Sequence, residues 1–575
     1  MVLTCLRRGS LLFGTCLVGS MGAAEAPVGP VVELPTFVVE QSIPLPAPES
    51  WQYASGEGYE TLSQVSGRWT KQMVKEFLLF REAMGVVFPG LEPRPAMPMI
   101  FIFCDSRQFS RLVPAERDMP GVRTLHFAAG PENARLIVDP IIFLDSVEAA
   151  ELDPLASPLV RAPMEIDYFR QLRRSYLFAL FAQQEPRLPA WFEEGLAQIV
   201  MGMEYDRKRI TFGELAEPTY DLPPDRLIPI GGEEMDPLVQ LPYPVQDRDF
   251  QFALRQHFLS PLPEIFNMPR ESPTARAPYG SSWAKQASAF VHLGLYGQNR
   301  RFQKGFLQFL QRSATTAPTE DLFRACFGMG YDQMLTELRI YISAPVYDVM
   351  DYKAQGAGLG VPKEVTLRDA TPAEIGRIKG ETMSLAGRDQ DGRLEMIAAY
   401  SRGSRDPQLL AALGLMELAL DHAERARRFL EAAFAGKAVR PQAHVELARL
   451  RLAEAMTQPA ADGKLSAEQA AFVRQPLLLA RTQPMPPVST YELFADVWDR
   501  AQEGPTPPQL VILEEGVKRY PERLSLVYRT AAWEIRLGRR EQAEMLVAHG
   551  LALAASEAGR ARFRALQAQL SAAGK

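Results

Sequence analysis

The stretch Leu188-Pro-Ala-Trp-Phe-Glu-Glu-Gly-Leu-Ala197 decides the fold of the N-terminal half of this chain. It follows Phe169-Arg-Gln-Leu-Arg-Arg-Ser-Tyr-Leu-Phe-Ala-Leu-Phe181, in which apolar residues recur at the spacing of an α-helix. The two stretches predict a pair of helices, Ile166–Gln183 and Pro189–Met201, with a short break between them. The apolar stripe of the first helix consists of Ile166, Phe169, Leu172, Tyr176, Leu177, Leu180 and Phe181.

The patterns on either side of this pair predict one α+β domain over residues 55–345. The expected strands are the β-prone runs Met99–Cys104, Leu125–Ala128 and Arg135–Val138. The other expected helices are Gly58–Met84, Ser282–Tyr296, Arg301–Gln311 and Asp332–Ile342.

The C-terminal part is predicted to be helical from residue 371 to residue 575. Residues 346–370 contain three closely spaced glycines and are expected to form a linker. Directly after them, Thr371-Pro-Ala-Glu374 has the spacing of a capping box with proline at the first helical position, which predicts a helix start. The sequence that follows is rich in Ala, Leu, Arg and Glu.

This helical part contains degenerate repeats of small residues, which are needed where two antiparallel helices approach closely. Two units share the same spacing: Gly414, Ala426, Leu430, Ala433, with Pro441 closing the unit, and Ala531, Ala543, Leu546/Val547, Gly550. Leu513, Gly516 and Pro521 indicate another unit between them, and Pro459–Leu465 an insertion. The pattern resembles the tetratricopeptide repeat, whose period is about 34 residues. The alternative is a generic helical bundle, because most aromatic consensus positions are replaced.

The helix pair itself resembles the peptidase MA-like branch of the gluzincin metallopeptidases, a zincin-like fold. The segment Leu188–Ala197 matches a block in which the glutamate of Glu-Gly-Leu-Ala is the third zinc ligand, and the preceding helix of that family carries HExxH. Weaker matches agree with it: Ile210-Thr-Phe-Gly213, Tyr279-Gly-Ser-Ser-Trp283, Phe290-Val-His292 and Ala325-Cys-Phe-Gly328. The resemblance covers roughly residues 60–345.

The chain departs from this family at the residues that perform the chemistry. Alignment on the Glu-Gly-Leu-Ala block places Arg174 and Phe178 at the two zinc-binding histidines, and Ser175 at the general-base glutamate. Arginine stays protonated and phenylalanine has no donor atom, so neither binds a metal. Only Glu194 stands at a ligand position, and a catalytic zinc needs three protein ligands. The resemblance therefore predicts an inactive domain with no catalytic residue, no metal and no cofactor.

Arg174 and Phe178 are four residues apart and share one helix face. We expect the Arg174 guanidinium to reach the carboxylate of Glu194 or of Glu193 in place of a metal, with Phe178 filling the space of the second ligand. The alternative is a solvated arginine on an exposed helix. Adjacent glutamates do not face each other on a helix, so Glu193 and Glu194 are not expected to act as a pair.

A cleft in the same domain would draw on further residues. The candidates are Trp191, Glu193, Tyr279, Trp283 and His292. The domain has three histidines, His126, His257 and His292, and no two of them have ligand spacing. A nonstandard site that combines Glu194 with these histidines is the alternative to an inactive domain.

The N-terminus predicts export. Arg7 and Arg8 precede an apolar run, Leu11–Met21, and small residues follow, so residues 1–24 are typical of a signal peptide. A retained anchor is the alternative, although the run is shorter than the roughly 18 residues of a membrane span. The proline-rich residues 25–54 are expected to form an extended arm. The mature chain keeps Cys104 and Cys326, which either pair or lie buried as free thiols.

These features together favour an exported scaffold of the periplasm or extracellular space over an enzyme. The chain has 575 residues, enough for several domains, and its net charge of −6 argues against nucleic-acid binding. We expect the repeats to bind a protein or peptide partner. The alternative function is an active hydrolase or peptidase with a nonstandard site in the same cleft.

Overall fold

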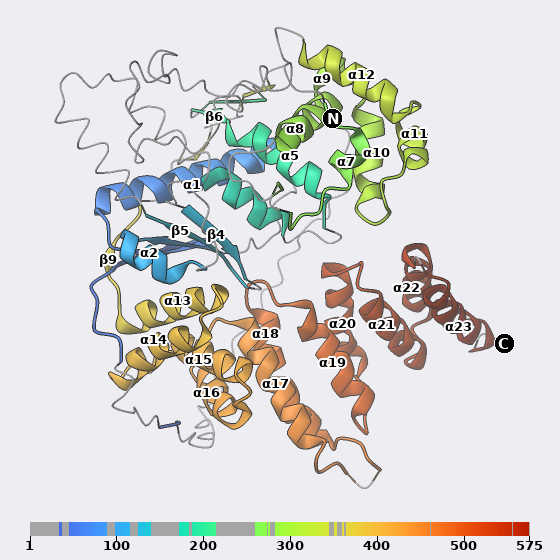
Figure 1. Cartoon of the computed structure of the whole chain (residues 1–575). Coiled ribbons are helices and arrows are strands. Elements are labelled where there is room, and N and C mark those ends of the chain that lie inside the picture. Colours follow the sequence, from blue (N-terminus) through green and yellow to red (C-terminus); the bar gives the residue numbers. More distant parts are fainter. Residues whose placement is uncertain are drawn as a thin grey trace, which may run out of the picture.

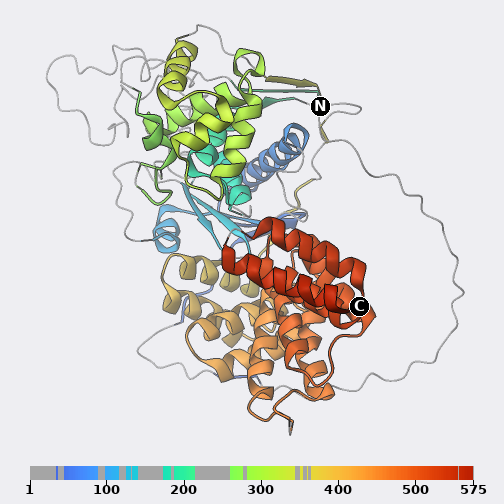
Figure 2. The same cartoon turned by 90° about the vertical axis from the view of Figure 1, so that its right-hand side faces the viewer.

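A computed structural model gives the arrangement of the chain (Figure 1). The structure describes residues 34–36, 45–88, 98–114, 125–130, 132–139, 172–182, 187–206, 208–213, 259–272, 274–275, 282–343, 350–353, 359–360, 364–460, 462–554 and 556–573. The layout is α+β: a mixed sheet and helices in the N-terminal part, followed by a C-terminal part that is helical in its described residues. In Figure 2 the sheet lies between the helices of the N-terminal part and those of the C-terminal part. The predicted signal peptide, residues 1–24, lies outside the described residues.

The main sheet has six strands in the order β4-β5-β3-β2-β1-β9. The strands are β1 (Gln52–Gly56), β2 (Tyr59–Ser63), β3 (Met99–Phe103), β4 (Leu125–Ala129), β5 (Ala134–Val138) and β9 (Arg368–Asp369). The central strands β2, β3 and β5 are parallel, and the β1, β4 and β9 pairings are antiparallel. A second sheet has the order β6-β7-β8, with β6 (Glu204–Tyr205), β7 (Arg209–Phe212) and β8 (Met350–Lys353). Strands β3, β4 and β5 confirm the three expected strands.

The expected helix over Gly58–Met84 is correct only in its second part. Helix α1 spans Gly67–Val87 and begins at Ser66, whose side chain accepts a hydrogen bond from the Trp69 backbone N–H. Residues before it form the β1–β2 hairpin, because Gly58 takes a φ of +78° that suits a tight turn. A long helical pattern therefore concealed a strand at its start.

Alternate residues of the buried strands point to opposite faces of the sheet, and each face has its own core. Phe101 and Phe103 of β3 lie on the face covered by α1 and by helix 172–181, where Phe77, Phe101 and Tyr176 make edge-to-face contacts. Ile100 and Ile102 lie on the other face, which is covered by α2 and α13. The two faces are thus buried by helices from different parts of the chain.

The rest of the N-terminal part is helical. Its helices are α2 (Ser106–Leu112), α5 (Ala190–Met201), α7 (Leu262–Phe266), α8 (Ser282–Leu295), α9 (Gly297–Arg300), α10 (Gln303–Ser313), α11 (Glu320–Phe327) and α12 (Tyr331–Ile342). Helices α5, α8, α10 and α12 confirm the expected helices, with ends that differ by at most two residues. Of the expected helix Ile166–Gln183, residues 172–182 are described; residues 172–181 are helical and residue 182 is a turn.

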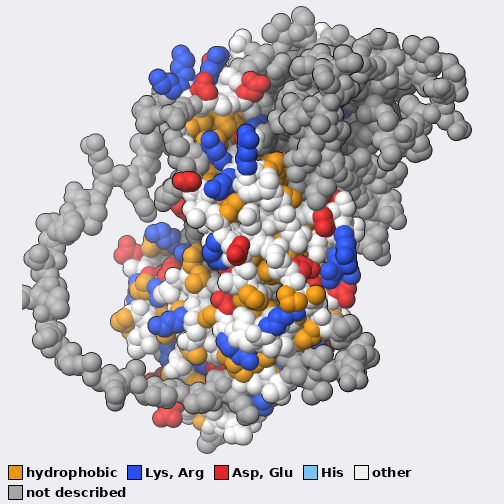
Figure 3. Space-filling model, turned by 90° about the vertical axis from the view of Figure 1, so that its left-hand side faces the viewer, with side chains coloured by type: hydrophobic (Ala, Val, Ile, Leu, Met, Phe, Trp, Pro, Cys, Tyr) orange, Lys and Arg blue, Asp and Glu red, His pale blue; other side chains and the backbone are white. Residues whose placement is uncertain are grey.

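Each C-terminal helix packs against the next helix along the chain. They are α13 (Pro372–Leu385), α14 (Asp389–Ser401), α15 (Pro407–Ala419), α16 (Ala423–Ala435), α17 (Pro441–Ala455), α18 (Ala467–Thr482), α19 (Val488–Arg500), α20 (Pro507–Arg519), α21 (Leu524–Arg536), α22 (Arg540–Leu553) and α23 (Glu557–Ala573). The close approaches predicted at glycines are confirmed: a Cβ at Gly414 would lie 2.6 Å from Leu430 Cγ, and one at Gly516 2.6 Å from Tyr491 Cγ. On the face seen in Figure 3, acidic, basic and hydrophobic side chains are interspersed.

The boundary regions are more ordered than the sequence predicts. Within the expected linker 346–370, strand β8 pairs with β7, and strand β9 pairs with β1. Within the expected arm 25–54, the last residues belong to β1. The capping box at Thr371 is confirmed, since its side chain accepts from the Glu374 backbone N–H. Backbone pairing between distant segments, which composition does not reveal, explains both corrections.

Among the described helices, none is both long enough and apolar enough to cross a membrane.

Candidate functional site

Helix α5 places Glu194 at the centre of the candidate site. The Glu194 side chain is only 2% exposed, so its charge requires close partners. The Arg174 Nη2 atom lies 2.6 Å from Glu194 Oε2, and Arg174 Nε donates to Oε1 at 3.4 Å. Gln198, one turn later on α5, donates from Nε2 to Glu194 Oε1 at 2.7 Å. Both carboxylate oxygens therefore already have hydrogen-bond donors.

Arg174 and Phe178 lie on one face of helix 172–181, as their spacing predicts. The Arg174 guanidinium carbon lies 4.6 Å from the centre of the Phe178 ring, a cation–π distance. The Arg174 side chain is 15% exposed, so the alternative of a solvated arginine is wrong. The expected bond from Arg174 to Glu194 is confirmed, and Phe178 is packed against the core beside it.

Glu193 points elsewhere and has its own cations. Its carboxylate lies 2.9 Å from Arg270 Nη2 and 3.3 Å from Arg187 Nε, and its side chain is buried. Burial raises the pKa of Glu193 above its ordinary value, although Arg270 and Arg187 act to lower it. Arg270 also donates to the Leu188 carbonyl oxygen at 2.7 Å, which fixes the start of α5. The two adjacent glutamates thus face different partners, as expected.

The other candidates for a cleft are core residues. Trp191 is 1% exposed and stacks on Phe309 at a ring distance of 5.9 Å. The indole of Trp283 donates to the Ile265 carbonyl oxygen, and His292 Nδ1 lies 2.5 Å from the Tyr341 hydroxyl. These three side chains are buried and pack α5 and α8 against their neighbours. Tyr279 and His257 lie outside the described residues.

Close packing of α5 on α8 fixes the position of Glu194. A Cβ at Gly195 would lie 2.6 Å from Val291 Cγ2 and 2.8 Å from the Ala287 carbonyl oxygen of α8. Only glycine allows this approach, which gives the Glu-Gly-Leu-Ala block a packing reason independent of chemistry. Ser175, at the position of the general base, is buried in the preceding helix.

A second polar cluster, which the sequence did not predict, lies beside the site. Arg173 Nη2 lies 2.6 Å from Glu76 Oε1 of α1, and its Nη1 donates to the Met201 carbonyl oxygen at 3.0 Å. The Tyr205 hydroxyl also donates to Glu76, and burial raises the pKa of Tyr205. The cluster joins α1, helix 172–181 and the end of α5. Its members are up to 129 residues apart, so no local pattern reveals it.

The residues at this site do not fit a zinc ion. Arg174 brings a fixed positive charge to the only carboxylate at a ligand position, and Phe178 offers no lone pair. Among the residues that the structure describes, no group of three or more His, Cys, Asp or Glu side chains is arranged to hold a metal ion. The arrangement is an internal ion pair that holds two helices together.

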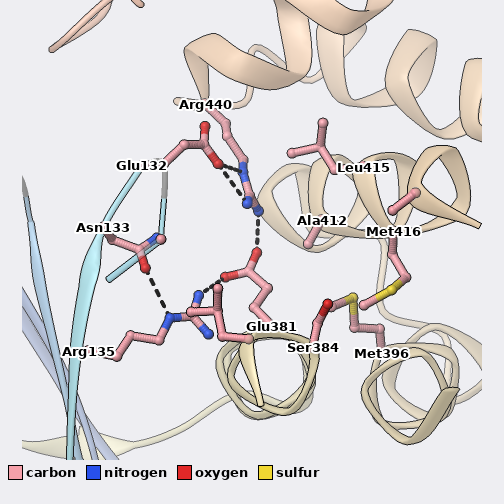
Figure 4. Close-up of a pocket in the computed structure, with 13 residues that line it drawn as sticks. Glu132, Asn133, Arg135, Glu381, Ser384, Met396, Ala412, Leu415, Met416 and Arg440 are labelled. Atoms are coloured by element: carbon pink, nitrogen blue, oxygen red, sulfur yellow. Dashed lines mark hydrogen bonds and ion pairs between the residues drawn. The ribbon is translucent and has the colours of Figure 1, made fainter. Parts of the chain in front are cut away.

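Away from the candidate site, another buried ion-pair network lies where the sheet meets the C-terminal helices (Figure 4). Arg135 Nη2 lies 2.5 Å from Glu381 Oε2 of α13, and Arg440 contacts both Glu381 and Glu132. Burial would raise the pKa of Glu381, but Arg440 and Arg135 lower it to about 2. The network borders a cavity of about 160 Å³. Its other wall is apolar and includes Leu385, Met396, Ala412, Leu415, Met416 and Ala419.

Comparison with known proteins adds no family to these observations. No protein-family model matches the chain, and a search of curated proteins finds no match. The likeness to metallopeptidases and to tetratricopeptide repeats therefore rests on the residues quoted above.

Proposed function

We propose that this protein is an exported, non-catalytic scaffold. In this proposal the N-terminal part is a zincin-like domain of metallopeptidase ancestry that has lost its metal. The C-terminal part is a tetratricopeptide-like solenoid that binds a protein or peptide partner in the periplasm or outside the cell.

The ion pair between Arg174 and Glu194 is the main observation that supports an inactive domain. A zinc site needs the carboxylate lone pairs, and here Arg174 and Gln198 occupy them at hydrogen-bond distance. Removing Arg174 would leave a buried carboxylate without its balancing cation, which is costly. The arginine is thus the charge-balancing substitute for a metal in this interpretation, and the site supplies no activated water.

The paired helices of residues 371–575 support the binding role. Small residues at Gly414 and Gly516 allow neighbouring helices to approach as in repeat proteins. Stacked helices of this kind present extended concave surfaces, which repeat proteins use for binding.

Metal analysis of the purified full-length protein tests the proposal. We expect substoichiometric zinc in the natural protein and no change in Glu194→Gln. The triple variant Arg174→His, Ser175→Glu, Phe178→His should bind about one zinc per chain, and adding Glu194→Gln should weaken that binding.

Two results would contradict the proposal. Stoichiometric zinc in the natural protein that is lost in Glu194→Gln would favour a hydrolase. A folded triple variant that takes up no zinc would remove the argument for metallopeptidase ancestry. Circular dichroism of each variant verifies that it is folded.

A further inference from the structure

The N-terminal arm contacts the C-terminal helices at two described segments, 34–36 and 45–50. Pro35 is buried, and its carbonyl oxygen accepts a hydrogen bond from the Tyr400 hydroxyl at 2.8 Å. Leu34 and Leu45 pack against the apolar cluster formed by α14, α15 and α16. In Figure 1, segment 45–50 runs beside α13 and α14. At these residues the arm is therefore a bound segment and not a free tail.

The surface that receives Pro35 has the features of a proline-binding site. Tyr400, at the end of α14, is 5% exposed and packs edge-to-face on Phe429 of α16 at 5.3 Å. The Arg405 guanidinium carbon lies 3.9 Å from the centre of the Tyr400 ring. Burial raises the pKa of Tyr400, so its hydroxyl remains a donor at neutral pH. Proline-rich segments have free carbonyl groups and are commonly bound by aromatic surfaces of this kind.

A separate anchor holds the arm close to this surface. Arg402 donates to the Pro46 carbonyl oxygen, and Glu49 accepts hydrogen bonds from Lys379 at 2.8 Å and Gln108 at 2.9 Å. Lys379 is fully buried and lies on α13. This anchor is much more extensive than the contact at 34–36. It keeps the upstream segment at high local concentration near Tyr400, even though the described residues of that segment, 34–36, make few contacts.

We propose that Tyr400, Arg405 and Phe429 form a binding site for an extended, proline-containing segment, and that the arm around Pro35 is its displaceable intramolecular ligand. The proposal rests on the binding role given to the repeats and names the class of segment that they take. A partner segment of the same chemistry would compete with the arm and would have to overcome its local concentration.

A cut in the folded chain tests this directly. A protease recognition sequence inserted between residues 40 and 41 of the full-length protein allows the arm to be cut after folding. A fluorescent peptide of residues 27–40 is then titrated, with anisotropy as the readout. We expect it to bind the cut protein at least tenfold more tightly than the uncut protein, where the tethered arm competes. The same peptide with Pro35→Ala should bind several-fold more weakly.

The chain offers a matched control for removing the hydroxyl group of Tyr400. Tyr520 also donates to a proline carbonyl, that of Pro486, at 2.6 Å, but in a distant helix pair. Tyr400→Phe in the cut protein should weaken peptide binding roughly three- to tenfold, and Tyr520→Phe should leave it unchanged.

The inference is overturned if the peptide does not bind a cut protein that retains its circular dichroism spectrum. It is also overturned if the two Tyr→Phe variants bind the peptide equally. Neither result depends on zinc content, so a failure here is distinguishable from a failure of the proposed scaffold function.

Discussion

Glu381 is the residue whose loss should most weaken the junction between the sheet and the C-terminal helices. Its carboxylate lies between Arg135 of β5 and Arg440 at the start of α17, and its side chain is 10% exposed. Glu381→Gln keeps the size of the side chain and removes the charge. Arg135, which is 2% exposed, would then lose the carboxylate that balances it.

The pKa of Glu381 gives the expected magnitude. It is about 2 in the folded chain against an ordinary 4.5, and each tenfold change in proton affinity corresponds to about 1.4 kcal/mol. Ionised Glu381 therefore stabilises the fold by about 3 kcal/mol, in the range of about 3–5 kcal/mol for breaking a buried ion pair. Because the folded pKa is lowered, this stability is present above about pH 4.5 and is lost as the pH falls toward 2.

Urea unfolding of the full-length protein, followed by far-ultraviolet circular dichroism, measures the effect. We expect the unfolding midpoint of Glu381→Gln to fall at pH 7, and its difference from the natural protein to shrink as the pH drops below about 4.5. Glu454→Gln is the matched control, because Glu454 is half-exposed and pairs with Arg427 at 2.7 Å. That variant should lose at most about 1 kcal/mol. Equal midpoints for the two variants at pH 7 would refute the reasoning.

Three further predictions follow from single positions. Gly195→Ala should destabilise the protein by about 1–3 kcal/mol in thermal unfolding, because its Cβ would lie 2.6 Å from a methyl carbon of α8. Glu534 is buried beside Glu514, and burial raises its pKa to about 7; stability should therefore fall as the pH rises from 4.5 to 7, and Glu534→Gln should flatten this slope in urea midpoints. Cys104 and Cys326 are both free, and burial raises the pKa of the Cys104 thiol; of these two thiols a maleimide should label Cys326 and not Cys104 in the native protein, as peptide mass spectrometry would show.

The sequence predicted those elements whose patterns are local. Strands β3 and β5 are short apolar runs, and α5 and α8 carry helical spacing, so their residues alone determine them. The start of α1 was mistaken because residues 59–63, at the beginning of the expected helix, form strand β2 after a hairpin turn at Gly58. The bond between Arg174 and Glu194 was predictable because alignment on one block placed both residues, and a buried carboxylate needs a cation.

The ion-pair network of Arg135, Glu381 and Arg440 was not predictable, because its residues lie far apart in the sequence. Arg135 and Glu381 are 246 residues apart, and nothing near either residue marks it as paired. Arg135 stands in a strand whose neighbours are apolar, and its side chain faces α13 only because alternate strand residues point to opposite faces. The same holds for the bond from Tyr400 to Pro35, which joins residues 365 apart.

Helix α13 shows that the predicted boundary at residue 370 does not separate two independent parts of the chain. Composition assigns α13 to the helical repeats, yet Ile378 and Met383 belong to the core on one face of the sheet. Charged residues of the same helix bind the N-terminal part as well: Arg377 lies 2.5 Å from Glu60 of β2, and Lys379 2.8 Å from Glu49. A fragment that begins at residue 371 would expose these groups, so the binding role proposed for the C-terminal helices has to be tested with the full chain. In the intact protein α13 packs both on the sheet and on α14, and it thereby holds the surface around Tyr400 of α14 in a fixed position relative to the sheet.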